Sequence, residues 1–166
     1  MAMSIQFIPI KEKDLAVVLE IYNHYVLNST ATFHLESVDT KELLSTLPPL
    51  GHSRYQSFLV MDNQVVCGFC YLSQFRKKEA YDASAEITLY LHPEHTGKGL
   101  GRTVLVYMEG VAKEKGMKNL VGVITAENKG SIALFEKQGY FKVGHLKSIG
   151  KKFGKWLDVV SYQKQI

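Results

Sequence analysis

Apolar residues recur at helical spacing in two long stretches of the chain. In residues 11–27 they are Leu15, Val18, Leu19, Tyr22 and Val26. After residue 99 they are Leu100, Val104, Leu105, Met108, Val111 and Ala112. This spacing gathers apolar side chains on one face, so each stretch is predicted to form an amphipathic helix. Shorter helices are predicted after Asp39, in a capped segment that ends before Pro48, and from Asn128 to Gln138.

Strand patterns occupy most of the remaining chain. Short apolar runs predict strands at 4–10, 119–125, 140–145 and 156–163, and two more strands joined at Asp62-Asn63. Residues 83–92 alternate between an apolar face and a polar face, and the polar face consists of Glu86, Thr88, Tyr90 and His92. Antiparallel strands come first, followed by strand-helix-strand-helix-strand. This order predicts one α/β domain over residues 1–166, built on a mixed sheet.

Composition and charge narrow the classes of partner. The chain has 166 residues, of which 46% are hydrophobic, so it can form one sizeable core. Its formal net charge of +4 comes from scattered basic residues, which fits an anionic small ligand better than nucleic acid. No apolar stretch approaches the roughly 18 residues of a membrane span. We therefore expect a soluble cytoplasmic protein with no membrane or nucleic-acid partner.

The two cysteines form a C-x-x-C pair, Cys67 and Cys70, inside a predicted strand. Side chains at an odd separation in a strand point to opposite faces, so the two sulfurs are not expected to share a ligand. There is also no second pair for zinc and no helix start to activate a thiolate. We expect two small core residues and no metal.

Three glycines at 97, 99 and 101 stand immediately before the second long helix. Such a loop turns several N–H groups into one hollow, and the helix start adds free N–H groups and a positive dipole end, a combination that binds phosphate or pyrophosphate. The P-loop spacing fails, and Arg102 replaces the third glycine of the dinucleotide fingerprint. Glu86 lies on the strand that leads into this loop, and a base beside an anion site indicates a group-transfer enzyme. A simple tight turn, with a polar face open to solvent, remains the alternative.

Several segments carry a family resemblance. The sequences AEITLYLHPEHTGKGLGR and VGVITAENKGSIALFEKQGY resemble the GNAT superfamily of N-acetyltransferases, whose signature is Gln/Arg-x-x-Gly-x-Gly/Ala. Within it, IYNHYVLNSTATF, FRKKEAYD and VGHLKSIGKKFGKWLDVV are similar to the phosphinothricin and methionine sulfoximine acetyltransferases. The resemblance covers nearly the whole chain.

The resemblance implies a mixed, splayed central sheet with helices on both faces, and acetyl-CoA as co-substrate. The pyrophosphate would lie on the loop formed by Gly97, Lys98, Gly99, Leu100, Gly101 and Arg102. The pantetheine arm would run along the residues Leu89, Tyr90 and Leu91, near Asn128, Ser131 and Phe135. It also implies that Glu86 deprotonates the amine, that Phe33, Arg76 and Thr88 line the acceptor pocket, and that the WLD segment near the end helps form a homodimer.

Two positions depart from the family pattern. Thr96 stands where the signature has Gln or Arg, and Phe135 stands where relatives often have a Tyr or His that acts as the acid for the departing thiolate. Arg76 and the lysines at 152 and 155 are candidates for binding an acceptor carboxylate. The acceptor is expected to be small and amino-acid-like. A polyamine, an aminoglycoside, a protein N-terminus, or a non-catalytic role in binding acetyl-CoA remain alternatives.

Overall fold

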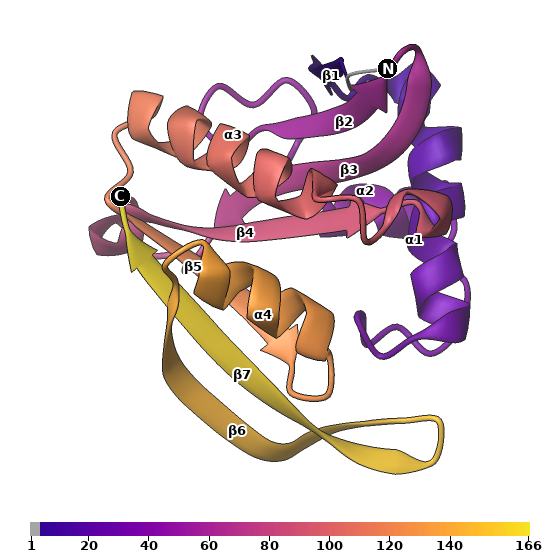
Figure 1. The fold of residues 1–166 in the computed structure, drawn as a ribbon, viewed down its shortest axis with the longest axis vertical. Helices are drawn as coiled ribbons and strands as arrows, with labels where there is room; N and C mark the ends of the chain where they lie inside the picture. Colours follow the sequence, from indigo (N-terminus) through magenta and orange to yellow (C-terminus); the bar gives the residue numbers. More distant parts are fainter. Residues whose placement is uncertain (1–3) are drawn as a thin grey trace.

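The computed structural model describes residues 4–166 and contains a seven-stranded mixed sheet with the order β1-β2-β3-β4-β5-β7-β6 (Figure 1). The strands are β1 Ile5–Pro9, β2 Ser57–Asp62, β3 Val65–Gln74, β4 Ser84–Leu91, β5 Asn119–Thr125, β6 Phe141–Lys152 and β7 Lys155–Gln165. Neighbouring strands are antiparallel except β4 and β5, which are parallel. The predicted mixed sheet is thus confirmed.

Helices cover both faces of the sheet, as predicted (Figure 1). They are α1 Leu15–Asn28, α2 Thr40–Thr46, α3 Leu100–Glu114 and α4 Lys129–Lys137, with short 3-10 turns at Glu12–Asp14, Glu79–Tyr81 and Pro93–His95. The first helix packs on one face, where Val18 and Ile21 meet Phe69. The helix after the glycines packs on the other face, where Val104 and Met108 are fully buried. Within residues 4–166, no helix is long and apolar enough to cross a membrane.

Capping residues and a glycine set the ends of two helices. The Asp39 carboxylate accepts a hydrogen bond from the Glu42 N–H at 2.9 Å, and the Glu42 carboxylate accepts one from the Asp39 N–H at 3.0 Å. This reciprocal capping box starts α2, which ends at Thr46, before Pro48. The longer helix α3 begins after Gly99, whose φ of +79° suits a residue without a side chain.

The expectation for the cysteines was partly wrong. Both are buried, free core residues, as predicted. However, both belong to the core cluster on the α3 side of the sheet rather than to opposite faces. The reason is a β-bulge: Val60 pairs with Gly68 and Met61 with Val66, which leaves Cys67 unpaired. The extra residue shifts the alternation by one, so that an odd separation returns both side chains to one side.

The sheet opens between β4 and β5. The two strands pair only over 84–86 and 119–121, after which they diverge. Residues 87–91 of β4 therefore have one edge without a neighbouring strand, and α4 follows directly after the free end of β5. This gap positions the site described below.

The last two strands are longer than predicted. They extend to residues 141–152 and 155–165, forming a hairpin that projects beyond the rest of the sheet (Figure 1). Residues 146–151 are exposed except for Gly150, so their sequence lacks the alternation that marks a half-buried strand. Their strand pairing comes from β7 rather than from burial.

Candidate active site

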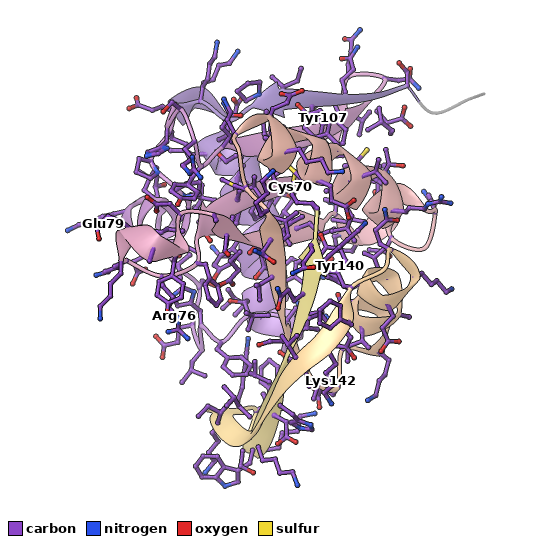
Figure 2. The ribbon with its side chains drawn as sticks, turned by 90° about the vertical axis from the view of Figure 1, so that its left-hand side faces the viewer. Cys70, Arg76, Glu79, Tyr107, Tyr140 and Lys142 are labelled. Atoms are coloured by element: carbon purple, nitrogen blue, oxygen red, sulfur yellow. The ribbon has the colours of Figure 1, made fainter. Side chains whose placement is uncertain are left out.

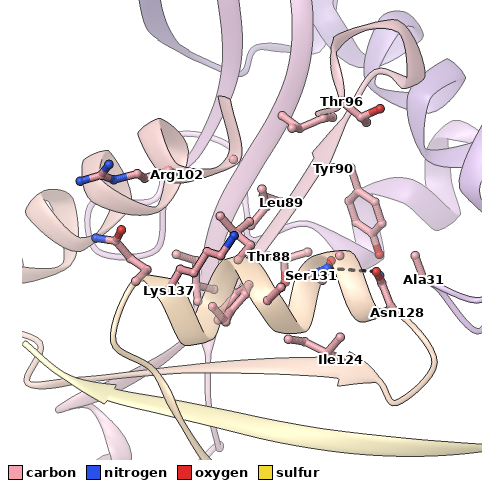
Figure 3. A pocket seen from close by; sticks show the side chains of 18 of the residues that line it. Ala31, Thr88, Leu89, Tyr90, Thr96, Arg102, Ile124, Asn128, Ser131 and Lys137 are labelled. Atoms are coloured by element: carbon pink, nitrogen blue, oxygen red, sulfur yellow. Dashed lines mark hydrogen bonds between the residues drawn. The ribbon is translucent and has the colours of Figure 1, made fainter. Parts of the chain in front are cut away.

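A cleft of about 640 Å³ fills the gap between β4 and β5 and continues between the start of α3 and α4 (Figure 3). We call it the cofactor cleft. Arg102 from α3 and Lys137 from α4 line it, and no carboxylate does. Its floor is largely apolar, with Leu89, Ile124 and Leu134 among the lining residues. A cleft with two cations, no acid and an apolar interior suits an anionic ligand with a long organic arm.

The glycine loop forms one end of the cofactor cleft. Gly97 and Gly99 have φ values of +73° and +79°, a backbone conformation that side chains disfavour, and a carbon added at either would meet open space. The N–H groups at the start of α3 are free of intrahelical partners and lie at the positive end of the helix dipole. The loop residues therefore fit a pyrophosphate through their backbone.

Two side chains of this loop point elsewhere, whereas Thr96, just before the loop, lines the cofactor cleft. Lys98 and Leu100 line a separate cavity of about 180 Å³ together with Cys67. The Thr96 hydroxyl donates to the Pro93 carbonyl at 2.9 Å and so closes the preceding turn. Only the backbone of Lys98 and Leu100 is thus available to a ligand in the cofactor cleft.

The open edge of β4 forms a second part of the cleft. The His92 N–H donates to the Cys67 carbonyl of β3 at 2.8 Å. Because backbone groups alternate along a strand, the N–H and carbonyl groups of Leu89 and Leu91 point away from β3, into the gap. The Leu91 carbonyl accepts a hydrogen bond from the Tyr25 hydroxyl of α1. The Leu89 groups are left for a ligand that lies alongside the strand.

The third part is the face of α4. Asn128 caps this helix, accepting a hydrogen bond from the Ser131 N–H at 3.2 Å (Figure 3). Phe135 also lines the cleft but is only 4% exposed. Its ring lies over Gly122 of β5, where an added carbon would be 2.3 Å from it. Sequence reasoning missed Lys137 and Gln138, although Gln138 continues the helical spacing of Ser131 and Phe135.

Glu86 lies on the opposite face of β4, which α1 covers. It is half-buried, and burial raises the pKa of its carboxyl above the ordinary 4.5, while the charge of Arg76 partly offsets this. Tyr90, on the same face, packs against the rings of Tyr22 and Tyr25 at 5.5 and 5.3 Å. On this face α1 therefore packs against Tyr90, while Glu86 and Thr88 are half-buried.

The residues predicted to bind the acceptor come from separate segments. Thr88 lines the cofactor cleft, whereas Glu86, Phe33 and Arg76 do not. Arg76 is exposed in the turn between β3 and β4, with its guanidinium 5.3 Å from the Phe75 ring (Figure 2). Phe33 is 39% exposed and lies against Gly150 of β6. We call Phe33, Arg76, Glu86 and Thr88 the acceptor region.

The fold and the cofactor cleft agree with one family. The acetyltransferase (GNAT) domain family matches residues 9–161. The chain belongs to this family. Like other GNAT domains, it is an acetyl-CoA-dependent N-acetyltransferase.

Several known proteins similar to this GNAT domain are named for action on amino acids or their analogues. An L-amino acid N-acyltransferase of Escherichia coli is 31% identical over 99% of this chain and 94% of its own. An L-methionine sulfoximine/L-methionine sulfone acetyltransferase of Salmonella typhimurium is 33% identical over 92% of this chain and 90% of its own. A phosphinothricin acetyltransferase of Sinorhizobium meliloti, solved in complex with acetyl-CoA, has a TM-score of 0.89 and 30% identity, covering 100% of this chain and 89% of that one.

Proposed function

We propose that this protein acetylates the primary amine of a small amino-acid-like acceptor, of the methionine sulfoximine or phosphinothricin type, with Glu86 as the general base. The observation that carries the proposal is a half-buried carboxylate of raised pKa on the strand whose open edge lines the cofactor cleft. The names of the relatives support the class of acceptor.

The chemistry explains why a base is needed. The α-amine of a free amino acid is mostly protonated at neutral pH, and the protonated form has no lone pair for attack on the thioester. A carboxylate whose pKa is raised toward working pH removes the proton more effectively, directly or through water, and contributes about 10²–10⁴-fold in rate. The pKa of Glu86, raised by burial, supports this role.

In this proposal the cofactor cleft holds acetyl-CoA at three places. The backbone from Gly97 to Arg102 binds the pyrophosphate, and the residues Leu89 to Leu91 bond the pantetheine arm as an added strand would. Asn128, Ser131 and Phe135 border the arm on the α4 side. Arg102 and Lys137 balance the phosphate charges, because they are the two charged side chains that line the cleft.

The Leu89 N–H supplies a donor to the thioester oxygen, which gains negative charge when the amine attacks. Phe135 has no proton to give, so water protonates the departing thiolate. A thiol with a pKa of about 8.5 leaves without a strong acid.

We propose that Arg76 binds the acceptor carboxylate, while Phe33 and Thr88 contact the rest of the acceptor. A guanidinium matches a carboxylate through two parallel hydrogen bonds. The relative position of Arg76 and Glu86 supports this arrangement, since the Arg76 charge acts on the Glu86 pKa.

We also propose a homodimer formed through the outer surface of the β6–β7 hairpin. Six large apolar side chains are exposed there: Phe141, Val143, Leu146, Ile149, Phe153 and Trp156. The concentration of exposed apolar side chains in one hairpin favours burial by a second copy. Light scattering should give twice the 18.7 kDa of one chain. Two free thiols and a need for acetyl-CoA fit the cytoplasm.

The test is release of free thiol from acetyl-CoA with a panel of amines. We expect turnover with L-methionine sulfoximine, L-methionine sulfone or phosphinothricin, and much lower kcat/KM with spermidine, an aminoglycoside or a peptide N-terminus. The reverse order of activity would contradict the proposed acceptor. Tight binding of acetyl-CoA with no turnover on any amine would identify a cofactor-binding protein instead.

A further inference from the structure

The tip of the β6–β7 hairpin rests on the loop that carries Phe33. The Lys152 ammonium donates to the Thr32 carbonyl oxygen at 2.8 Å, across 120 residues of sequence. From the other side, the Thr125 hydroxyl of β5 donates to the Thr30 carbonyl oxygen. In Figure 1 the hairpin tip lies on the same side of the molecule as the end of α1. The loop after α1 is therefore held between the end of β5 and the hairpin.

Gly150 leaves no room for a side chain beside Phe33. A carbon added at Gly150 would lie 2.3 Å from Cε2 and 2.8 Å from Cδ2 of the Phe33 ring, well inside van der Waals contact. Its φ is not positive, so close approach rather than conformational freedom explains the glycine. Gly144, on the same strand, differs: an added carbon there would make an ordinary 3.8 Å contact with Ser161.

Lys152 is unusual for a lysine because it is only 2% exposed. None of the ion pairs found in residues 4–166 includes it. Burying a cation without an anion is unfavourable, and burial lowers the pKa of Lys152. Lys155, which we grouped with it, is exposed and pairs with Glu127 at 2.8 Å. The buried ammonium of Lys152 thus holds one backbone carbonyl of the loop that carries Phe33.

A bulge in β6 directs the tip of the β6–β7 hairpin toward the loop that carries Phe33. Leu146 pairs with Val159 and Gly150 pairs with Leu157, so residues 147–149 all oppose Asp158. The Asp158 carboxylate accepts a hydrogen bond of 2.7 Å from the Ser148 N–H and fixes the bulge. Bulges bend a strand and redirect the side chains that follow. The residues that follow here are Gly150 and Lys152.

We propose that Gly150 and Lys152 are positioning residues that set the size of the acceptor. They hold the Phe33 ring back against the hairpin, and so leave room for an extended acceptor side chain where Phe33 contacts the acceptor. This inference rests on the proposed function, in which Phe33 contacts the acceptor. A methyl group at position 150 pushes the ring away from the hairpin and shortens the space for the acceptor.

The experiment compares kcat/KM for L-methionine sulfone with that for L-alanine. In Gly150→Ala we expect the ratio of the two values to fall at least tenfold, with acetyl-CoA affinity changed less than twofold. Gly144→Ala is the matched control and should leave the ratio within twofold of the wild type. An unchanged ratio in Gly150→Ala, with the wild type active on both acceptors, overturns the inference.

A double-mutant cycle separates a direct effect on Phe33 from general damage. In a Phe33→Ala background, Gly150→Ala should change the ratio no further, because the ring it displaces is gone. An equal change in both backgrounds overturns the inference. If Gly150→Ala does not fold, Lys152→Met, which keeps the stem and removes the tether, should lower the same ratio, and an unaltered ratio there also overturns it. A wild type that acetylates neither of these amino acids, nor L-methionine sulfoximine or phosphinothricin, instead refutes the proposed function.

Discussion

The cofactor cleft and the acceptor region are built in different ways. The cleft comes mainly from one continuous stretch, residues 87–138, and backbone groups contribute to it at three places: the positive-φ turns at Gly97 and Gly99, the open edge of β4 and the start of α3. The acceptor region gathers Phe33, Arg76 and Glu86 from distant segments. The hydrogen bond from Lys152 to Thr32 ties the loop that carries Phe33 to the β6–β7 hairpin. A site made of backbone groups keeps its ligand when single side chains are substituted. A site made of side chains can change its ligand through single substitutions.

The strongest way to test this contrast is to disable the acceptor region alone. Glu86→Gln should lower kcat/KM by about 10²-fold or more near pH 7, because the base is lost. Affinity for acetyl-CoA, measured by calorimetry, should stay nearly unchanged. Glu79→Gln, a matched change of an exposed acid in the neighbouring turn, should have no such effect. Wild-type rates in Glu86→Gln would show that another group takes the proton.

The pH profile sharpens the same assignment. Because burial raises the Glu86 pKa, kcat/KM of the wild type should fall as pH drops through a value above 4.5. Arg76 lowers that pKa, so Arg76→Gln should move the acidic limb to higher pH. If the acidic limb lies at the same pH in Arg76→Gln and in the wild type, the charge of Arg76 does not act on the base.

Disabling the cofactor cleft should give the opposite pattern. Gly99→Val puts a side chain where the pyrophosphate approaches and should weaken acetyl-CoA binding on the order of tenfold, the effect of losing about 1.4 kcal/mol. A side chain at positive φ also strains the fold by about 1–3 kcal/mol. Gly51→Val is the matched control, since Gly51 has a φ of +74° and open space but does not line the cleft. Equal cofactor affinity in the two variants would sink the loop assignment.

Lys137 tests whether a side chain contributes to the cleft at all. Lys137→Gln should weaken acetyl-CoA binding by no more than about fivefold, as expected for an exposed ion pair, and less at high salt. Lys129→Gln, at the other end of α4, should have no effect, since Lys129 does not line the cleft. Titration of acetyl-CoA at two salt concentrations measures both. Identical acetyl-CoA affinities in Lys137→Gln and the wild type would mean that backbone groups and Arg102 bind the phosphates without Lys137.

The smallest effect is expected at Phe135. Phe135→Tyr should raise kcat less than about threefold, because a thiol of pKa near 8.5 leaves well without an acid. The ring is tightly packed over Gly122, so thermal unfolding should be checked in parallel. A hundredfold gain in steady-state kcat, with KM for acetyl-CoA unchanged, would show that thiolate departure limits turnover.

The same contrast decides how much could be predicted from sequence. Glycine spacing, the periodicity of α3 and the Asn128 cap are local signals, and they predicted the elements around the cleft correctly. The Gly150 contact with Phe33 depends on a bulge and on a long-range approach, which leave no periodic trace. The bulge at Cys67 made the prediction for the cysteines wrong for the same reason, because alternation alone does not count an extra residue.

The short junction between β4 and β5 has a mechanical consequence. Three residue pairs join these strands, so the sheet has a seam along which its two halves can part. A ligand bonded to both sides of the gap holds the two halves together. Its binding stabilises the joined state by about 2.7 kcal/mol at a concentration one hundred times its Kd. Amide exchange at Leu89 should therefore slow as acetyl-CoA is added. The lifetime of the folded chain therefore depends on the concentration of its own co-substrate.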